Sequence, residues 1–179
     1  RMLDAIDDSV RVIYLATPNN PTGTKIANDD LDEFLRRVPE RIVVVLDEAY
    51  REYLEPADRP GTDHLPEMRP NVVVLRTFSK IHGLAGLRVG YAIGDPRMLR
   101  ILRRLQLPFA VSALAEAAAV AALDDMEFPA RTRLLNVTER DRAQSALAAA
   151  GIHYVPSQAN FILLRVGDGQ AIFQELMRR

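Results

Sequence analysis

The sequence predicts an α/β fold built on a mostly parallel β-sheet, and two patterns carry this prediction. First, residues 42–46 (IVVVL) and 71–75 (NVVVL) are short runs dominated by Val, which is typical of strands buried on both faces of a parallel sheet. Second, segments with the apolar spacing of helices alternate with such runs along the chain. Alternating strands and helices favour a parallel sheet with helices packed against it.

The other elements of the first half follow from local patterns. Residues 11–16 are a β-branched and apolar run that ends at a Pro-Asn-Asn-Pro turn, and residues 89–93 form a shorter run of the same kind. Residues 28–38 are predicted to be helical, because Leu and Phe recur on one side of them. Any of the first three residues of this helix can cap it, since Asn and Asp side chains accept hydrogen bonds from free N–H groups.

The second half begins after Asp95-Pro96 and is mainly helical. Apolar residues recur at helical spacing among arginines, then an Ala-rich stretch follows, and a long helical stretch ends at Gly151. The predicted helices are 98–105, 113–123, 131–150 and one that starts at 170, and the predicted strands are 152–155 and 161–166.

The composition excludes several classes of protein. The 179 residues carry a formal net charge of -1, which gives no general attraction to nucleic acid or to an anionic membrane. The sequence has no Cys, which excludes disulfides and a thiol nucleophile, and its three His are too scattered to suggest a metal site. No apolar run approaches the roughly 18 residues of a membrane span. We therefore expect a protein that binds neither nucleic acid nor membrane. The absence of Cys does not assign a compartment by itself, but it is compatible with the cytoplasmic location that we expect.

Three polar segments stand out, and each follows a predicted strand. They are residues 19–23 (NNPTG), residues 47–50 (DEAY), and residues 77–80 (TFSK) together with 86–90 (GLRVG). The carboxyl ends of parallel strands meet at one edge of a sheet, where ligands bind. Each segment alone has a simpler interpretation, as a turn, a helix cap, a surface pair or a structural ion-pair partner. The combination in this order favours a shared site.

In these segments the sequence resembles the fold type I aminotransferases, which use pyridoxal 5'-phosphate (PLP). The matching residues are 16–23, 46–50 and 77–90, and within the family residues 108–115 (PFAVSALA) and 156–161 (PSQANF) are similar to the histidinol-phosphate aminotransferase branch. The resemblance covers nearly the whole chain.

The resemblance implies a three-layer α/β/α fold with a mostly parallel sheet, followed by the start of a small α+β domain. Residues 1–130 would be part of the PLP-binding large domain. Residues 131–179 would be the linking helix and the beginning of the C-terminal small domain.

The resemblance also implies catalytic roles for Lys80, Asp47 and Tyr50. Lys80 lies eight residues before Arg88, the spacing of the family's PLP-bearing lysine and its phosphate-binding arginine. Once the substrate amine displaces it, such a lysine moves the α-proton of the substrate. Asp47 matches the carboxylate that keeps the pyridine nitrogen protonated, and Tyr50 matches a hydroxyl donor to the ring oxygen.

The cofactor-binding residues implied by the resemblance include these three and four more. Asn20 matches the amide that, with Tyr50, donates to the ring oxygen. Thr77, Ser79 and Arg88 match the residues that bind the cofactor phosphate, with the arginine able to bind two oxygens at once.

The implied reaction transfers the amine of a small phosphorylated amino alcohol to 2-oxoglutarate through PLP, as a step of histidine biosynthesis. The resemblance also implies that the protein is a homodimer. A threonine-phosphate decarboxylase or an aromatic aminotransferase of the same fold remains an alternative, as does an inactive fragment or a non-catalytic module. Intact Lys80, Asp47 and Arg88 argue against a degenerate site, because packing does not need them.

Parts of the family's site have no match in this sequence. They are an early helix that holds the phosphate, an aromatic residue that stacks on the ring, and the arginine that binds the substrate carboxylate. We therefore expect the chain to be a fragment that, alone, binds PLP weakly or not at all and exposes apolar surface.

Overall fold

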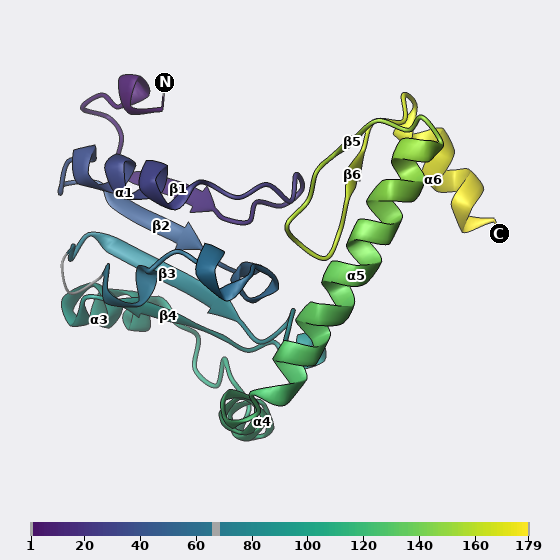
Figure 1. The fold of residues 1–179 in the computed structure, drawn as a ribbon. Coiled ribbons are helices and arrows are strands. Elements are labelled where there is room, and N and C mark those ends of the chain that lie inside the picture. Colours follow the sequence, from purple (N-terminus) through teal and green to yellow (C-terminus); the bar gives the residue numbers. More distant parts are fainter. Residues whose placement is uncertain (1, 66–68, 179) are drawn as a thin grey trace.

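The computed structural model describes residues 2–65 and 69–178, and its centre is a four-stranded sheet in the order β1-β2-β3-β4 (Figure 1). Strands β1 (Val12–Ala16), β2 (Val43–Asp47) and β3 (Val72–Thr77) are parallel to one another. Strand β4 (Gly90–Gly94) is antiparallel to β3. The prediction of a mostly parallel sheet is confirmed. Each strand begins one residue after the first residue of its predicted run.

Helix α1 (Asn28–Arg37) covers one face of this sheet. Its Leu31 and Leu35 are buried against alternate residues of the strands, which include Leu15, Val44, Leu46, Val72 and Val74. The predicted side-chain cap of this helix is wrong. Asn28 already lies inside the helix, so the N-cap is Ala27, which has no side-chain oxygen to offer.

Helix α3 (Pro96–Leu105) packs on the opposite face of the sheet. Leu99 lies so close to Gly94 that a Cβ built there would be 3.2 Å from its Cδ2 and 3.6 Å from a methyl carbon of Val73. Val73 points away from the α1 face, since its neighbours in β3 point toward it. Helices therefore lie on both faces, which confirms the predicted α/β/α layering.

The rest of the chain forms a long arm. Helix α4 (Ala113–Asp124) is followed by α5 (Glu127–Ala149), which runs from α4 to the hairpin of β5 (Tyr154–Val155) and β6 (Leu163–Leu164) and to helix α6 (Gly169–Met177) (Figure 1). All the predicted elements are present, although the two strands are shorter than their apolar runs. Arg179, the end of the last predicted helix, lies outside the described residues.

No helix in the described ranges is both long and apolar enough to cross a membrane.

Candidate functional site

The polar segments singled out in the sequence meet at the carboxyl edge of the three parallel strands. Asp47 is the last residue of β2 and Thr77 is the last residue of β3. Arg88 lies just before β4, and because β4 is antiparallel it starts at this same edge. Segments that are distant in the sequence are therefore brought together by the sheet order alone.

Two cavities at this edge share Asp47 in their walls. One, of about 320 Å³, is lined by Asp47, Thr77, Ser79, Lys80 and Arg88 together with Ala49, Leu75 and Arg76. The other, of about 280 Å³, is lined by Asn20, Asp47 and Tyr50 together with Tyr14, Ala16, Pro18 and Asn19. All seven residues that the sequence nominated for the site lie around this pair of cavities.

Asp47 is held by a hydrogen bond at each carboxylate oxygen. Its Oδ1 accepts from the backbone N–H of Ala49 at 3.0 Å, and its Oδ2 accepts from the hydroxyl of Tyr14. Partial desolvation of the phenol raises the pKa of Tyr14 to about 12, helped by the hydrogen bond to Asp47 and by the negative charge of that carboxylate. The carboxylate therefore has a fixed orientation between two donors.

Asn20 and Tyr50 form a second pair. Nδ2 of Asn20 donates to the Tyr50 hydroxyl over 3.1 Å. The ring of Tyr50 is buried and meets the ring of Phe161 edge-on, with centroids 5.0 Å apart and planes at 80°. Nζ of Lys80 lies 5.2 Å from the Tyr50 ring centroid. The amine, which lines the first cavity, is thus held beside an electron-rich ring that lines the second.

Glu48 follows Asp47 but faces the other side of the sheet, because successive strand residues alternate. Its carboxylate is fully buried and lies 2.9 Å from Arg76 and 3.4 Å from Arg51, and it accepts a hydrogen bond from Thr62. Burial raises the pKa of Glu48, while the contacts with Thr62 and Arg76 oppose that rise. This buried ion cluster ties the end of β2 to the end of β3 and fixes the backbone beneath Asp47.

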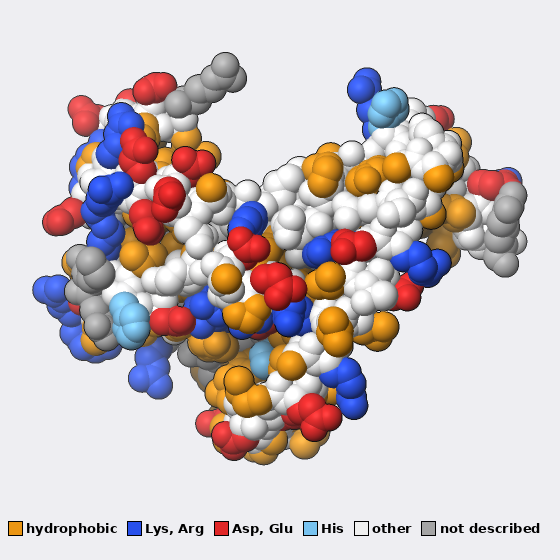
Figure 2. All heavy atoms as spheres, in the orientation of Figure 1, with side chains coloured by type: hydrophobic (Ala, Val, Ile, Leu, Met, Phe, Trp, Pro, Cys, Tyr) orange, Lys and Arg blue, Asp and Glu red, His pale blue; other side chains and the backbone are white. Residues whose placement is uncertain are grey.

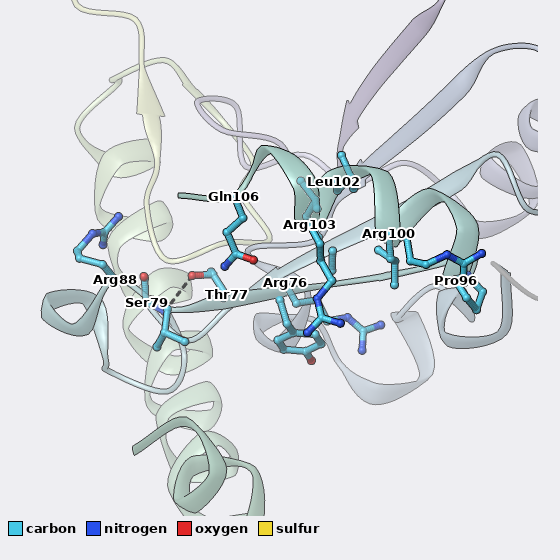
Figure 3. Close-up of a pocket in the computed structure, with 15 residues that line it drawn as sticks. Arg76, Thr77, Ser79, Arg88, Pro96, Arg100, Leu102, Arg103 and Gln106 are labelled. Carbon is cyan, nitrogen blue, oxygen red and sulfur yellow. Dashed lines mark hydrogen bonds between the residues drawn. The ribbon is translucent and has the colours of Figure 1, made fainter. Parts of the chain in front are cut away.

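Thr77, Ser79 and Arg88 make their hydrogen bonds within their own loop. Oγ1 of Thr77 accepts from the backbone N–H of Ser79 at 3.1 Å, and the Arg88 guanidinium donates to the carbonyl of Ala85 at 2.7 Å. Arg88 adopts a left-handed backbone conformation with φ of 54°. The three residues also line one end of a larger cavity of about 1020 Å³ between α3 and the sheet (Figure 3). Figure 3 shows Arg103 of α3 and Gln106, the residue directly after α3, reaching toward it.

The hairpin loop between β5 and β6 packs against the turn that carries Asn20. The Gly23 carbonyl accepts from the backbone N–H of Gln158 at 2.7 Å. A Cβ at Gly23 would lie 2.1 Å from Oγ of Ser157, so only glycine permits this approach. Ala159 is fully buried in a cluster with Tyr50, and Phe161 packs against that cluster. The hairpin in the second half of the chain thus packs against Tyr50 and against the turn that carries Asn20.

Sequence reasoning missed Tyr14 and Phe161 as neighbours of the site. Tyr14 precedes the first polar segment by several residues, and its approach to Asp47 follows only from the pairing of Ala16 with Asp47 and of Tyr14 with Val45. Phe161 was noted only as part of a matching segment. Nothing in the local pattern of either residue points to a site, because the contact depends on strand order and on the position of the hairpin.

Comparison with known proteins gives consistent results. The family model for aminotransferase class I and II matches residues 1–179. Histidinol-phosphate aminotransferase 1 of Thiobacillus denitrificans is 50% identical over 179 residues, which are 100% of this chain and 47% of that protein. The aromatic amino acid aminotransferase of Nocardia farcinica is 48% identical over 174 residues, or 96% of this chain and 48% of that protein.

Among solved structures, the histidinol-phosphate aminotransferase of Sinorhizobium meliloti in complex with pyridoxal-5'-phosphate superposes with a TM-score of 0.87 at 33% identity. The match covers 95% of this chain and 47% of that one. The chain spans about half the length of the relatives it matches.

Proposed function

The chain belongs to the aminotransferase class I and II family, and from this premise we propose that its full-length protein is a PLP-dependent aminotransferase. The proposed reaction transfers the amine of histidinol phosphate to 2-oxoglutarate, as a step of histidine biosynthesis. The observation that carries this proposal is the placement of an amine, a carboxylate and two sets of hydrogen-bond donors around one pair of cavities.

The chemistry of these side chains fits PLP. The Asp47 carboxylate suits a protonated ring nitrogen, since an opposite charge at close range favours the protonated form. The Asn20 amide and the Tyr50 hydroxyl, already 3.1 Å apart, suit the ring oxygen. Two hydroxyls and a guanidinium suit a phosphate group. These three groups belong to Thr77, Ser79 and Arg88.

Bound PLP supplies an electron-accepting ring that stabilises negative charge at the α-carbon of the substrate. In the proposed mechanism Asp47 holds a proton at the ring nitrogen, which keeps that acceptor strong. Lys80 would hold the cofactor through Nζ, and the same nitrogen, once free, would move the proton at the substrate α-carbon. Lys80 lines the same cavity as Thr77 and Arg88, and its Nζ lies beside the Tyr50 ring of the other cavity.

We also propose that the protein is a cytoplasmic homodimer. The homodimer is supported by an exposed apolar surface on the segment from the end of α3 to the start of α4. Leu105 and Leu107 are each 78% exposed, Leu114 is 72% exposed and Phe109 is 100% exposed. Figure 2 shows hydrophobic side chains gathered over α4. An apolar surface of this kind is typical of a protein–protein contact. Light scattering on the full-length protein would contradict this part of the proposal if it gave the monomer mass.

The division of the chain remains part of the proposal. Residues 1–130 are proposed as part of the cofactor-binding domain, and residues 131–179 as the linking helix and the beginning of the small domain. The supporting observation is that α5 leads continuously from α4 to the hairpin.

A second candidate reaction is amino transfer from an aromatic amino acid. It is favoured by the relative from Nocardia farcinica, whose identity to this chain is nearly the same as that of the histidinol-phosphate enzyme from Thiobacillus denitrificans. Steady-state assays of the full-length protein with 2-oxoglutarate separate the two. We expect kcat/KM to be higher for histidinol phosphate than for phenylalanine, and the reverse order would assign the aromatic reaction.

Covalent attachment at Lys80 is the direct test of the proposed function. After incubation with PLP and reduction with borohydride, peptide mapping of the full-length protein should find the pyridoxyl group on Lys80. Lys80→Ala should abolish both the label and the transamination. The matched control is Lys25→Arg, because Lys25 is the other lysine of this sequence and its ion pair with Asp58 can be kept by arginine. Label on a different residue in the wild type would overturn the assignment.

A further inference from the structure

Tyr14 lines one of the two cavities but has no part in the proposed binding of the cofactor ring or phosphate. It lies on β1, one strand away from Asp47, and points to the same face of the sheet, since Ala16 pairs with Asp47 and alternate residues share a face. Its side chain is 58% exposed on a face where Val12 is also exposed. The phenol nevertheless reaches diagonally across to Oδ2 of Asp47.

The two donors on Asp47 differ in kind. The backbone N–H of Ala49 holds Oδ1 and comes with the turn that follows β2 in any sequence that makes this turn. The Tyr14 hydroxyl donates to Oδ2, and this contact exists only because the residue at position 14 is a tyrosine. Each carboxylate oxygen has two lone pairs, so one acceptor position on each remains for another donor.

We propose that Tyr14 is a positioning residue for Asp47, and that its hydroxyl fixes the plane of the carboxylate so that the free lone pairs face the cofactor ring nitrogen. This inference rests on the proposed PLP-dependent function. Tyr14 does not touch the reacting atoms and acts only through Asp47.

The choice of a phenol has a chemical consequence. A cationic donor at this position would neutralise the carboxylate and weaken its hold on a protonated ring nitrogen. A neutral donor orients the carboxylate and leaves its charge in place. Tyr14 stays neutral in the working range, because its pKa is raised to about 12 by partial desolvation, by the hydrogen bond and by the charge of Asp47. The other titratable groups that line this cavity are Asp47 and Tyr50.

The contact is tested first without cofactor, in the full-length protein with 13Cζ-labelled tyrosine. The Tyr14 signal is identified by its loss in Tyr14→Phe. At about pH 11 a tyrosine with an ordinary pKa near 10 is mostly ionised, and we expect Tyr14 to remain mostly protonated. Asp47→Asn removes the negative charge and should lower the pKa of Tyr14, so that its signal shifts toward the ionised form at the same pH. A Tyr14 titration that is the same in wild type and Asp47→Asn would overturn the contact.

The positioning role is tested by the equilibrium dissociation constant for PLP, measured by fluorescence. Tyr14→Phe keeps the ring and removes only the hydroxyl, so we expect an affinity about tenfold weaker, which corresponds to about 1.4 kcal/mol. The matched control is Tyr154→Phe, which makes the same chemical change on β5, outside the cavities. The thermal midpoints of both variants without cofactor should match that of the wild type.

The outcomes separate this inference from the proposed function. Wild-type affinity in Tyr14→Phe, with a Tyr14 titration that depends on Asp47, would mean that the contact exists but does not position the carboxylate, and would overturn the inference alone. A wild-type protein that does not bind PLP would overturn the proposed function and the role of Tyr14 with it.

Discussion

The candidate site has two ends that are held in different ways. The ring end, proposed to hold the cofactor ring, consists of Asn20, Asp47 and Tyr50, and the phosphate end, proposed to hold the cofactor phosphate, consists of Thr77, Ser79 and Arg88. At the ring end, Asp47 contacts Tyr14, Asn20 contacts Tyr50, and the Tyr50 ring rests on Phe161, so each contact joins segments that are far apart in the sequence. At the phosphate end, the hydrogen bonds of Thr77 and Arg88 go to the neighbouring residues Ser79 and Ala85. The ring end depends on tertiary structure, whereas the geometry of the phosphate end is formed locally by one loop.

This difference has a physical consequence for mutations. Hydrogen bonds between distant segments are lost together when the segments separate, so the ring end should respond to changes far from it. A loop that satisfies its own hydrogen bonds should respond mainly to changes in the groups that contact the ligand. Four substitutions test this comparison, from the largest expected effect to the smallest.

Asp47→Ala should have the largest effect, because it removes the charge at the centre of the ring end. A carboxylate at close range raises the pKa of a partner by about one to three units, and we expect transamination to fall by about 10²–10³-fold while PLP binding is partly retained. Steady-state kinetics and PLP binding of the full-length protein measure the two effects. Asp141→Ala, an exposed acid on α5, is the control. Near-normal turnover in Asp47→Ala would mean that another group holds the proton on the ring nitrogen.

Arg88→Lys should act on affinity more than on turnover. Lysine keeps the positive charge but loses the planar fork that binds two phosphate oxygens, so we expect the Kd for PLP to rise by about 10–100-fold. Activity at saturating PLP should remain close to that of the wild type, and Arg97→Lys on the surface of α3 serves as the control. A variant that binds PLP normally would show that Arg88 stays with the Ala85 carbonyl and does not bind the phosphate.

Features that depend on local sequence were predicted, whereas contacts between distant segments were not. The strands and the edge at which they end were predictable, because runs such as IVVVL and NVVVL followed by polar residues are local signals. Thr77 ends β3, and Ser79, Lys80 and Arg88 lie in the segment that follows it, so their proximity was also visible in the sequence. The helix was predicted to begin at residue 28 and does so, but a cap by Asn28, Asp29 or Asp30 was predicted wrongly, because all three lie inside its first turn and the N-cap is Ala27.

The tertiary neighbours of the ring end could not be predicted. Tyr14 meets Asp47 only through the β1–β2 register, and Phe161 meets Tyr50 only because the hairpin folds back on the turn. Likewise, the spacing of Asp47 and Glu48 gives no sign that one lines the site while the other is buried with Arg76 and Arg51. Strand order decides these contacts, and no local pattern encodes it.

Gly23→Ala should loosen the ring end from a distance. The backbone at Gly23 has φ of 72°, and an added Cβ would meet Ser157 at its Oγ and its Cβ, so the hairpin must shift. Strain in the left-handed region and overpacking each cost about 1–3 kcal/mol. We expect unfolding in urea at a lower midpoint and weaker PLP binding. Gly61→Ala is the matched control, since nothing lies within 4 Å of that position. Equal stability of the two variants would show that the hairpin is not fixed on this turn.

Phe161→Leu should have the smallest effect and is the sharpest test of the ring end as a tertiary assembly. Leucine keeps an apolar side chain in the cluster but removes the edge-on contact with Tyr50, whose centroid lies 5.0 Å away. Aromatic pairs contribute about 0.5–1.5 kcal/mol beyond their buried area, so the Tyr50 hydroxyl should become less well oriented and the Kd for PLP should rise by about 2–10-fold. Phe173→Leu on α6, an exposed phenylalanine, is the control.

The double variant Phe161→Leu/Tyr50→Phe decides between orientation and simple packing. If Phe161 acts by orienting the hydroxyl, its loss should have little further effect on PLP affinity once that hydroxyl is gone. Effects that add in full would mean that Phe161 only fills space and that the hairpin does not control the ring end.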